Sequence, residues 1–323
     1  MVYNALEDLI NGGGVRPILA ERRDDVFLVA ASFEPRSVAL TNGLALDYRA
    51  VRSFVYVNDD FLVTPGADAM KTAIAALQAN LEPKSDHFRI IDGSWENAGV
   101  QVEAIRNAFA EITPDKTPVT VTIDCTTFSR EALIVCLAML YSHCPAAQVR
   151  VAYVSPDIHG KWLSRGYRKV RSIVGFSGVQ QASRPNVLIV LSGFEGDRTV
   201  KLIEEYEPTQ VLLGFGDPPT IPSFLERNLS EHKLVLGRTD VKDFRFPADS
   251  ISDCTAAVEK LIEPLLERCN IVIAPMSTKL STLAVFNVAE RHREIQLAYC
   301  LPGEYNYADY STGTSRVFIE DLR

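Results

Sequence analysis

Two apolar runs in this chain each end in a turn that carries a glutamate followed by an arginine. In VFLVAASFEPR these residues are Glu34 and Arg36, and in NVLIVLSGFEGDR they are Glu195 and Arg198, with Gly193 opening the second turn. A carboxylate and a guanidinium at this spacing can hold a polar ligand, or they can pair with each other while glycine permits a tight turn. The spacing leaves both interpretations open.

The segment PMSTKLST follows another apolar run and contains Ser277, Thr278 and Lys279. Serine and threonine hydroxyls can bind phosphate oxygens or cap the helix that follows. A lysine at a helix start opposes the helix dipole, which a bound anion beside it would offset. The alternative is a capped helix whose lysine points to solvent.

In the first half, the segment DCTTFSRE offers Asp124, Thr127 and Arg130 in the corresponding place, without the lysine. Asp124 at the end of a strand can orient a hydroxyl or a metal ion, or it can cap a helix. A further carboxylate, Asp217 in GFGDPP, is a candidate acid-base residue or part of a rigid turn. No metal site is predicted, because the five histidines are scattered and the cysteines lack CxxC spacing.

Aromatic residues follow the last apolar run of each half. Tyr305, Tyr307 and Tyr310 lie in LPGEYNYADYSTG, and Tyr167 lies in the basic run SRGYRKVR. Such rings stack on nucleobases or pack inside the protein. The basic run either meets an anionic ligand or forms a solvated face.

The composition is that of an ordinary globular protein. Of 323 residues, 47% are hydrophobic and 23% charged, and the formal net charge is -8. A negative charge argues against extended binding to duplex DNA, which needs clustered lysine and arginine. We expect a soluble, cytoplasmic protein without a membrane partner, because the six cysteines suit a reducing compartment and no apolar run reaches about 18 residues.

Short runs rich in valine and isoleucine alternate with helical patterns, which predicts an α/β fold with mostly parallel sheets. The predicted strands of the first half are 26–32, 53–57, 88–91, 119–125 and 149–153, with helices from Ala67 and from Ser129, the latter an N-cap. Those of the second half are 187–191, 210–214, 233–236, 270–274 and 295–300, with helices at 199–206, 252–266 and 279–291.

The Phe-Glu turn, the Ser/Thr segment and the aromatic tail recur in the same order after the first, fourth and fifth predicted strands of each half. This internal duplication predicts two tandem Rossmann-like domains, 1–178 and 186–323, joined by a polar linker at 179–185. Ligands of open parallel sheets bind at the carboxyl ends of the strands, so the recurring segments meet at that edge.

SGFEGDR and PMSTK, placed after the first and fourth strands, resemble the ligand segments of the CARF domains of CRISPR-associated proteins and of the related SAVED domains. Pro275 and Met276 stand where those domains usually carry glycines. The resemblance implies a cyclic or linear oligonucleotide ligand at the carboxyl edge and an effector carried by a separate protein, because no effector segment is visible in this chain.

The leading hypothesis is therefore a nucleotide-recognition or scaffold subunit that works with a partner in a regulatory or defence complex. Its ligand is expected at Gly193, Glu195, Arg198, Ser277, Thr278, Lys279 and Tyr305, with Glu34, Arg36, Asp124 and Thr127 in the first half. No cofactor is indicated apart from a nucleotide or cyclic oligonucleotide. A nucleotide- or phosphosugar-processing enzyme and a purely structural subunit remain alternatives.

Overall fold

The computed structural model describes residues 2–3, 19, 22–112, 118–221 and 223–322. The chain forms two compact units: unit 1 comprises Met1–Gly160 and Tyr307–Arg323, and unit 2 comprises Lys161–Asn306. Each unit is built on one large, mostly parallel sheet. The predicted α/β class with two Rossmann-like units is therefore confirmed.

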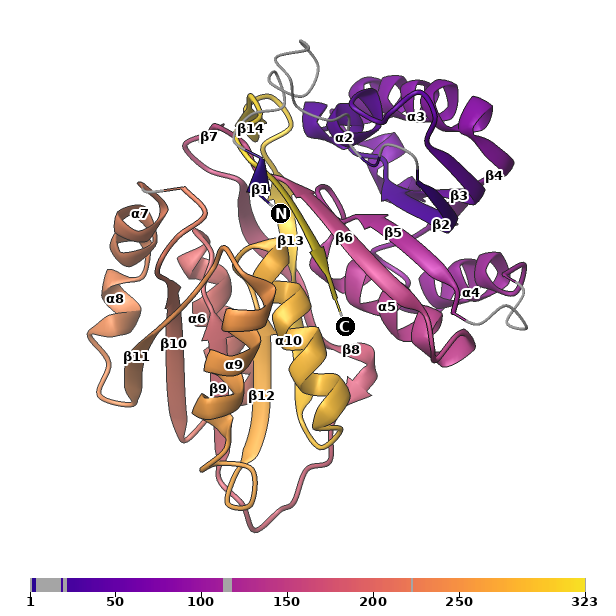
Figure 1. The fold of residues 1–323 in the computed structure, drawn as a ribbon. Helices are drawn as coiled ribbons and strands as arrows, with labels where there is room; N and C mark the ends of the chain where they lie inside the picture. Colours follow the sequence, from indigo (N-terminus) through magenta and orange to yellow (C-terminus); the bar gives the residue numbers. More distant parts are fainter. Residues whose placement is uncertain (1, 4–18, 20–21, 113–117, 222, 323) are drawn as a thin grey trace. The chain divides into compact units, whose positions relative to one another are not determined.

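Unit 1 contains a seven-stranded sheet in the order β1-β15-β6-β5-β2-β3-β4 (Figure 1). Strands β2 to β6 are parallel, whereas β15 runs antiparallel to β6 and β1 antiparallel to β15. The bounds are β1 (Val2–Tyr3), β2 (Arg23–Ala30), β3 (Arg49–Asn58), β4 (Ser85–Gly93), β5 (Thr120–Asp124), β6 (Gln148–Val154) and β15 (Val317–Asp321). Every strand predicted in the first half is present.

Helical segments cover both faces of this sheet. Val29 of β2 packs with Met70 and Leu77 of α3 on one face, while Phe54 of β3 contacts Phe109 of α4 on the other, with ring centroids 5.9 Å apart. The helical segments are η1 (Pro35–Val38), α2 (Ala39–Asn42), η2 (Asp59–Val63), α3 (Ala67–Leu81), η3 (Glu82–Lys84), α4 (Ala98–Phe109) and α5 (Arg130–His143).

Unit 2 contains a six-stranded sheet in the order β11-β10-β9-β12-β13-β8. Strands β9 to β13 are parallel and β8 runs antiparallel to β13. The bounds are β8 (Ser164–Ser177), β9 (Asn186–Leu191), β10 (Gln210–Gly216), β11 (Val241–Phe246), β12 (Asn270–Pro275) and β13 (Gln296–Tyr305). The five parallel strands therefore follow the same spatial order as β2 to β6 in unit 1, which supports the duplication.

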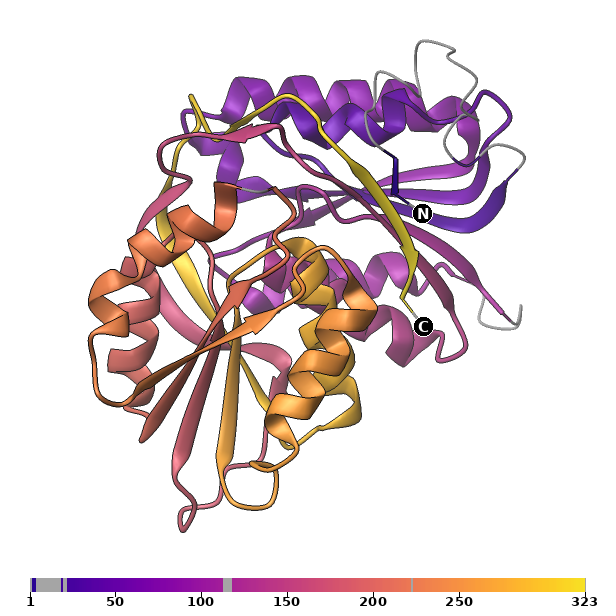
Figure 2. The same ribbon diagram turned by 60° about the vertical axis from the view of Figure 1, so that its left-hand side comes forward.

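Helices cover both faces of the unit 2 sheet as well. Val190 of β9 lies in one core cluster with Leu202 of α6 and Val235 of α8. Phe176 of β8 contacts Phe286 of α10 on the opposite face, where Figure 2 shows α9 and α10 side by side. The helices are α6 (Gly196–Tyr206), α7 (Ser223–Glu231), α8 (Lys233–Leu236), α9 (Ile251–Ile262) and α10 (Lys279–Arg291).

One predicted strand of the second half is wrong. Residues 233–236 form the short helix α8, and the third parallel strand is β11 instead. A run of four mostly apolar residues fits a helix as well as a strand, so the pattern alone could not decide. Strand β11 lies at the edge of the sheet and exposes Lys242, Asp243 and Arg245, so its sequence lacks the apolar run that is typical of a buried strand.

A two-residue strand, β7 (Ile158–His159) or β14 (Ser311–Thr312), comes first after the fifth parallel strand of each half, and the next strand joins the sheet of the other half. Strand β8 follows β6 in the chain but pairs with β13, whereas β15 follows β13 but pairs with β6. The observed units therefore differ from the predicted domains 1–178 and 186–323. The predicted linker, 179–185, lies between β8 and β9, which belong to the same sheet. Hydrophobic periodicity identifies a strand but not the sheet edge that it joins, so the sequence pattern did not reveal this boundary.

Candidate functional site

In both units the first and fourth parallel strands are neighbours. Strand β2 pairs with β5, and β9 pairs with β12 until both end at the paired residues Leu191 and Pro275. The loops that follow these strands therefore start at the same sheet edge, where open α/β sheets bind their ligands.

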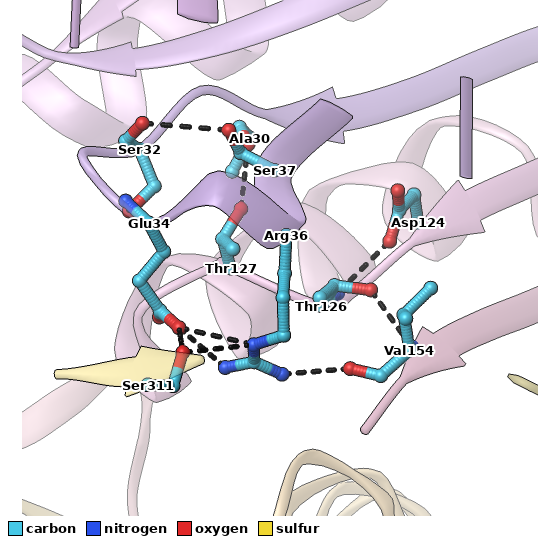
Figure 3. A network of polar contacts seen from close by, with 10 residues as sticks. All are labelled: Ala30, Ser32, Glu34, Arg36, Ser37, Asp124, Thr126, Thr127, Val154 and Ser311. Carbon is cyan, nitrogen blue, oxygen red and sulfur yellow. Dashed lines mark hydrogen bonds and ion pairs between the residues drawn. The ribbon is translucent and has the colours of Figure 1, made fainter. Parts of the chain in front are cut away.

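In unit 1, Arg36 is buried and binds the nearby Glu34 together with two groups from distant parts of the sequence (Figure 3). Its Nη2 lies 2.5 Å from Glu34 Oε2, its Nη1 donates to the Val154 carbonyl at 2.7 Å, and its Nε lies 3.2 Å from Ser311 Oγ. Ser311 also donates to Glu34 Oε2 at 2.8 Å. We call this set, Glu34, Arg36, Ser311 and the Val154 carbonyl, the Arg36 brace.

The Arg36 brace is a buried ion pair whose charges are compensated internally. Burial lowers the pKa of Arg36, but the carboxylate of Glu34 and the ring of Tyr153 outweigh it and raise that pKa above its usual range. Only 4% of Arg36 and 7% of Glu34 is exposed. These predicted ligand residues therefore hold the loop after β2 against β6 and the β14 strand (Ser311–Thr312), rather than facing solvent.

Asp124, at the end of β5, is 1% exposed. Its Oδ1 accepts a hydrogen bond from the Thr126 N–H at 3.0 Å, but its Oδ2 has no hydrogen-bond partner. Burial raises the pKa of Asp124 to about 6, although the bond from Thr126 and the nearby Arg36 lower it. Burial thus shifts the pKa of this carboxyl group toward neutrality.

Thr127, in the Ser/Thr segment of the first half, supports a strand end instead of capping the helix. Thr127 donates to the Ala30 carbonyl at 2.7 Å, and the helix cap is Ser129, which accepts from the Ala132 N–H at 3.1 Å, as predicted. Helix α5 starts at Arg130, a half-buried residue. Helix α5 therefore begins with a cation, as α10 does with Lys279. The sequence did not reveal this correspondence, because Arg130 lies three residues after Thr127 whereas Lys279 directly follows Thr278.

In unit 2, Arg198 occupies the corresponding place and is 1% exposed. It donates to the Cys300 carbonyl, and its Nη2 lies 3.7 Å from Met276 Sδ. Its Nε has no partner. Burial lowers the pKa of Arg198, but Glu195 and Tyr299 outweigh it and raise that pKa.

Glu195 in unit 2 accepts a hydrogen bond from Ser164 Oγ at 3.1 Å. The neighbouring Asp197 accepts from the Gly166 N–H at 2.8 Å, so the loop after β9 is tied to β8 at two points. We call this set, Arg198 with Glu195, Ser164 and the Cys300 carbonyl, the Arg198 brace. It fixes the SGFEGDR turn by contacts within the unit.

The two braces are built from matching positions. Each arginine binds the carbonyl of the residue after a matched tyrosine, Tyr153 in β6 and Tyr299 in β13. Each glutamate accepts from a serine, Ser311 or Ser164, that follows the fifth strand of the other half. The braces therefore bond the exchanged segments to the sheets that they join.

The roles of these serines were missed at the sequence level. The aromatic tails of the halves match only loosely, and the two serines lie far in sequence from their glutamates. The sequence offered one signal, because a glycine follows each serine by two residues. In the structure these glycines, Gly166 and Gly313, have a positive φ of 59° and 66°. Such a glycine marks a fixed backbone turn.

The PMSTK segment of unit 2 opens α10, as predicted. Thr278 caps the helix by accepting from the Ser281 N–H at 3.2 Å, and it donates to the Ala248 carbonyl at 3.1 Å. Ser277 and Lys279 are half-buried, and Lys279 is the first residue of α10. A Cβ added to Gly193 would lie 2.4 Å from the Met276 carbonyl oxygen, so the two loops pack backbone against backbone.

The aromatic tails pack within the units. Tyr307 and Tyr310 lie against Phe33, with ring centroids 4.9 and 5.7 Å apart. Tyr305 is half-buried at the end of β13. Tyr167 in β8 is 47% exposed, with the Lys201 ammonium 5.1 Å from its ring centroid.

The remaining candidate is Asp217, which follows the strand paired with β9. Asp217 is exposed after β10. His232 is buried in unit 2, where its Nδ1 donates to the Asn228 carbonyl at 3.0 Å and its Nε2 accepts from Thr199 Oγ1 at 2.9 Å. Burial lowers the pKa of His232, so neutral imidazole fits this pair of contacts.

In the described part of the chain, no group of three or more histidine, cysteine or acidic residues is placed to hold a metal ion. The six cysteines, all described, form no disulfide. None of the described helices is both long and apolar enough to cross a membrane.

Comparison with known proteins adds no family to this geometry. No protein-family model matches the chain, and no curated protein matches its sequence. The function is therefore argued from the two units themselves.

Proposed function

We propose that the protein is a nucleotide-recognition or scaffold subunit that works with a separate partner or effector in a regulatory or defence complex. The observation that supports this most directly is the carboxyl edge of the unit 2 sheet. There β9 and β12 end at the same level, and α6 and α10 begin a few residues later. Helix N-termini present backbone N–H groups and partial positive charge to a phosphate.

Within this proposal, Lys279 and Ser277 contact the ligand. Both are half-buried at the start of α10, where an anion would offset the unfavourable position of the Lys279 ammonium beside the helix N-terminus. Thr278 keeps the helix start in place through its cap. The resemblance of PMSTK and SGFEGDR to CARF and SAVED ligand segments supports the same location and an oligonucleotide ligand.

Glu195 and Arg198 serve as positioning residues in this proposal. Their side chains are buried and bonded to Ser164 and to the Cys300 carbonyl. Gly193 allows the loop that they fix to pack on Met276, at the edge of the ligand segment. In unit 1, Glu34 and Arg36 play the same part.

The test combines native mass spectrometry of protein purified from its own host with titration of inorganic phosphate and of cyclic oligonucleotides. We expect a retained nucleotide together with a partner chain, and nucleotide binding about 10- to 100-fold weaker in Lys279→Ala. The matched control is Lys260→Ala, an exposed lysine in the last turn of α9 in the same unit. Equal binding by both variants contradicts the ligand site, and a partner without a ligand favours the purely structural subunit.

An enzyme that processes a nucleotide or phosphosugar is a second candidate, and Asp124 is the observation that favours it. Burial raises its pKa to about 6, and one of its oxygens has no hydrogen-bond partner. A carboxyl group of this kind can exchange a proton at neutral pH. Turnover that disappears in Asp124→Asn, while the circular dichroism spectrum stays unchanged, would establish this function, with Asp217→Ala tested beside it.

A further inference from the structure

Strand β8 is the last strand of the unit 2 sheet. It is 14 residues long and pairs with β13 on one side, while no strand of the described chain pairs on its other side. An edge strand carries N–H and C=O groups along its outer border, which is a template for a further strand. In β8 this border is occupied at Gly166, whose N–H donates to Asp197, so the template lies beyond Gly166.

Unit 1 shows how the equivalent strand is completed. Strand β15 lies against β6 as β8 lies against β13, and β1 pairs antiparallel on its outer side, at Val317 and Phe318. Val317 pairs with Val154, and Val170 pairs with Cys300, the matching residue of the other half. The place on β8 that corresponds to the binding place of β1 is therefore Val170 with the next residue, Arg171.

The charge of β8 selects the kind of strand that fits. Four cations occur within seven residues, and three of them, Arg165, Arg168 and Lys169, are exposed. Like charges opposite each other destabilise a strand pair, so β8 of a second copy is a poor partner. An extended segment rich in aspartate and glutamate places opposite charges across the pair and is attracted from a distance.

We propose that the outer edge of β8 binds an extended acidic segment of a partner protein by antiparallel strand addition, centred on Val170 and Arg171. The proposal rests on the proposed function, because the partner of the scaffold supplies this segment. Main-chain hydrogen bonds hold the segment, and its carboxylates meet the basic side chains of β8. Exposed Tyr167 and Val174 offer apolar contact on either side of the centre.

The probe is a fluorescein-labelled peptide of about ten residues with alternating glutamate and valine, titrated by fluorescence anisotropy against the full chain. We expect binding that weakens about tenfold or more in the double variant Arg165→Glu, Lys169→Glu. The matched control is Lys242→Glu, Arg245→Glu, the same charge change on β11 at the opposite edge of the sheet, which should bind as the wild type does.

Two further measurements separate strand addition from simple charge attraction. The peptide should slow hydrogen exchange of the amides around Val170 and Arg171, and a peptide N-methylated at every second residue should lose binding, because it cannot pair its main chain. Equal binding of the N-methylated peptide, protection elsewhere in the chain, equal loss in the two double variants, or no binding overturns the proposal. The cations of β8 would then only protect its edge from self-association.

The two proposals fail separately. A partner chain found by native mass spectrometry, with β8 amides unprotected by the peptide, removes the strand addition and leaves the proposed function. Protected β8 amides, in a protein that carries neither nucleotide nor partner from its host, remove the proposed function and leave the strand addition.

Discussion

The Arg36 brace and the Arg198 brace occupy the same place in two copies of one fold, yet they differ in chemistry. Arg36 contacts the Glu34 carboxylate through two nitrogen atoms, whereas Arg198 binds a carbonyl, contacts Met276 Sδ and leaves its Nε without a partner. Both copies keep the bond from arginine to the carbonyl after the fifth-strand tyrosine. That bond is therefore the shared structural requirement, and the ion pair is an addition of unit 1.

A second difference lies beside each arginine. Unit 1 has Asp124 at the end of its fourth strand, and unit 2 has Pro275 there. Unit 2 instead buries His232 beneath α6. Burial thus favours the neutral form of both groups, an acid in unit 1 and a base in unit 2.

The largest effect is expected from removing the arginines. Arg36→Met should lower the free energy of unfolding of unit 1 by about 3 to 5 kcal/mol, because the buried Glu34 carboxylate loses its cation. Arg198→Met should cost about 1 to 3 kcal/mol, because mainly a hydrogen bond to a carbonyl is lost. Urea unfolding followed by Trp95 in unit 1 and Trp162 in unit 2, the two tryptophans of the chain, measures both.

Each arginine variant is compared with its own background, Trp162→Phe for unit 1 and Trp95→Phe for unit 2. The double variant Glu34→Gln, Arg36→Met should recover part of the loss, since no uncompensated charge remains buried. Equal losses in the two units, without recovery in the double variant, would mean that the ion pair adds nothing to the unit 1 brace.

The buried titratable groups predict opposite pH dependences. The pKa of Asp124 is raised to about 6, so its contribution is fullest when it is protonated, and unit 1 should lose stability as pH rises from about 4 to about 6. The total is on the order of 3 kcal/mol. The pKa of His232 is lowered, so unit 2 should lose stability as pH falls below about 6.5.

The variants Asp124→Asn and His232→Gln isolate these contributions. Each removes the titrating group, so the difference between variant and parent unfolding free energies should change with pH in opposite directions in the two units. A difference that stays constant from pH 4 to 8 for Asp124→Asn would show that this carboxyl group keeps an ordinary pKa.

The parallel core of both units could be predicted from the sequence, because buried strands such as β9 are almost wholly apolar and recur at regular spacing. The correspondence of the glutamates, arginines and tyrosines between the two halves could also be recognised. The partners of the arginines could not be predicted, because a backbone carbonyl, such as that of Val154 or Cys300, has no sequence signature.

The exchange of β8 and β15 was hidden for a related reason. Each follows its fifth strand closely in the chain, and connected strands are usually neighbours in a sheet, so local order suggested the wrong edge. The hydrogen bonds from Ser164 to Glu195 and from Ser311 to Glu34 hold the exchanged segments to their sheets. Hydrophobic periodicity does not predict such bonds between residues far apart in the sequence. The sequence thus placed the candidate residues at the carboxyl edge of each sheet, but it did not predict the burial of the charged ones.

The smallest predicted effect tests the exchange itself. Ser311→Ala should destabilise unit 1 by about 1 to 2 kcal/mol, because Glu34 and Arg36 each lose a contact, and Ser164→Ala should destabilise unit 2 by about 1 kcal/mol. Ser311 belongs to the second half of the sequence and Ser164 to the first. Because Ser311 lies in unit 1 and Ser164 in unit 2, Trp95 should report Ser311→Ala and Trp162 should report Ser164→Ala. Exposed Ser252→Ala, at the start of α9, provides a matched control. If Ser311→Ala affected Trp162 instead, or Ser164→Ala affected Trp95, the braces would not join the exchanged segments to their sheets.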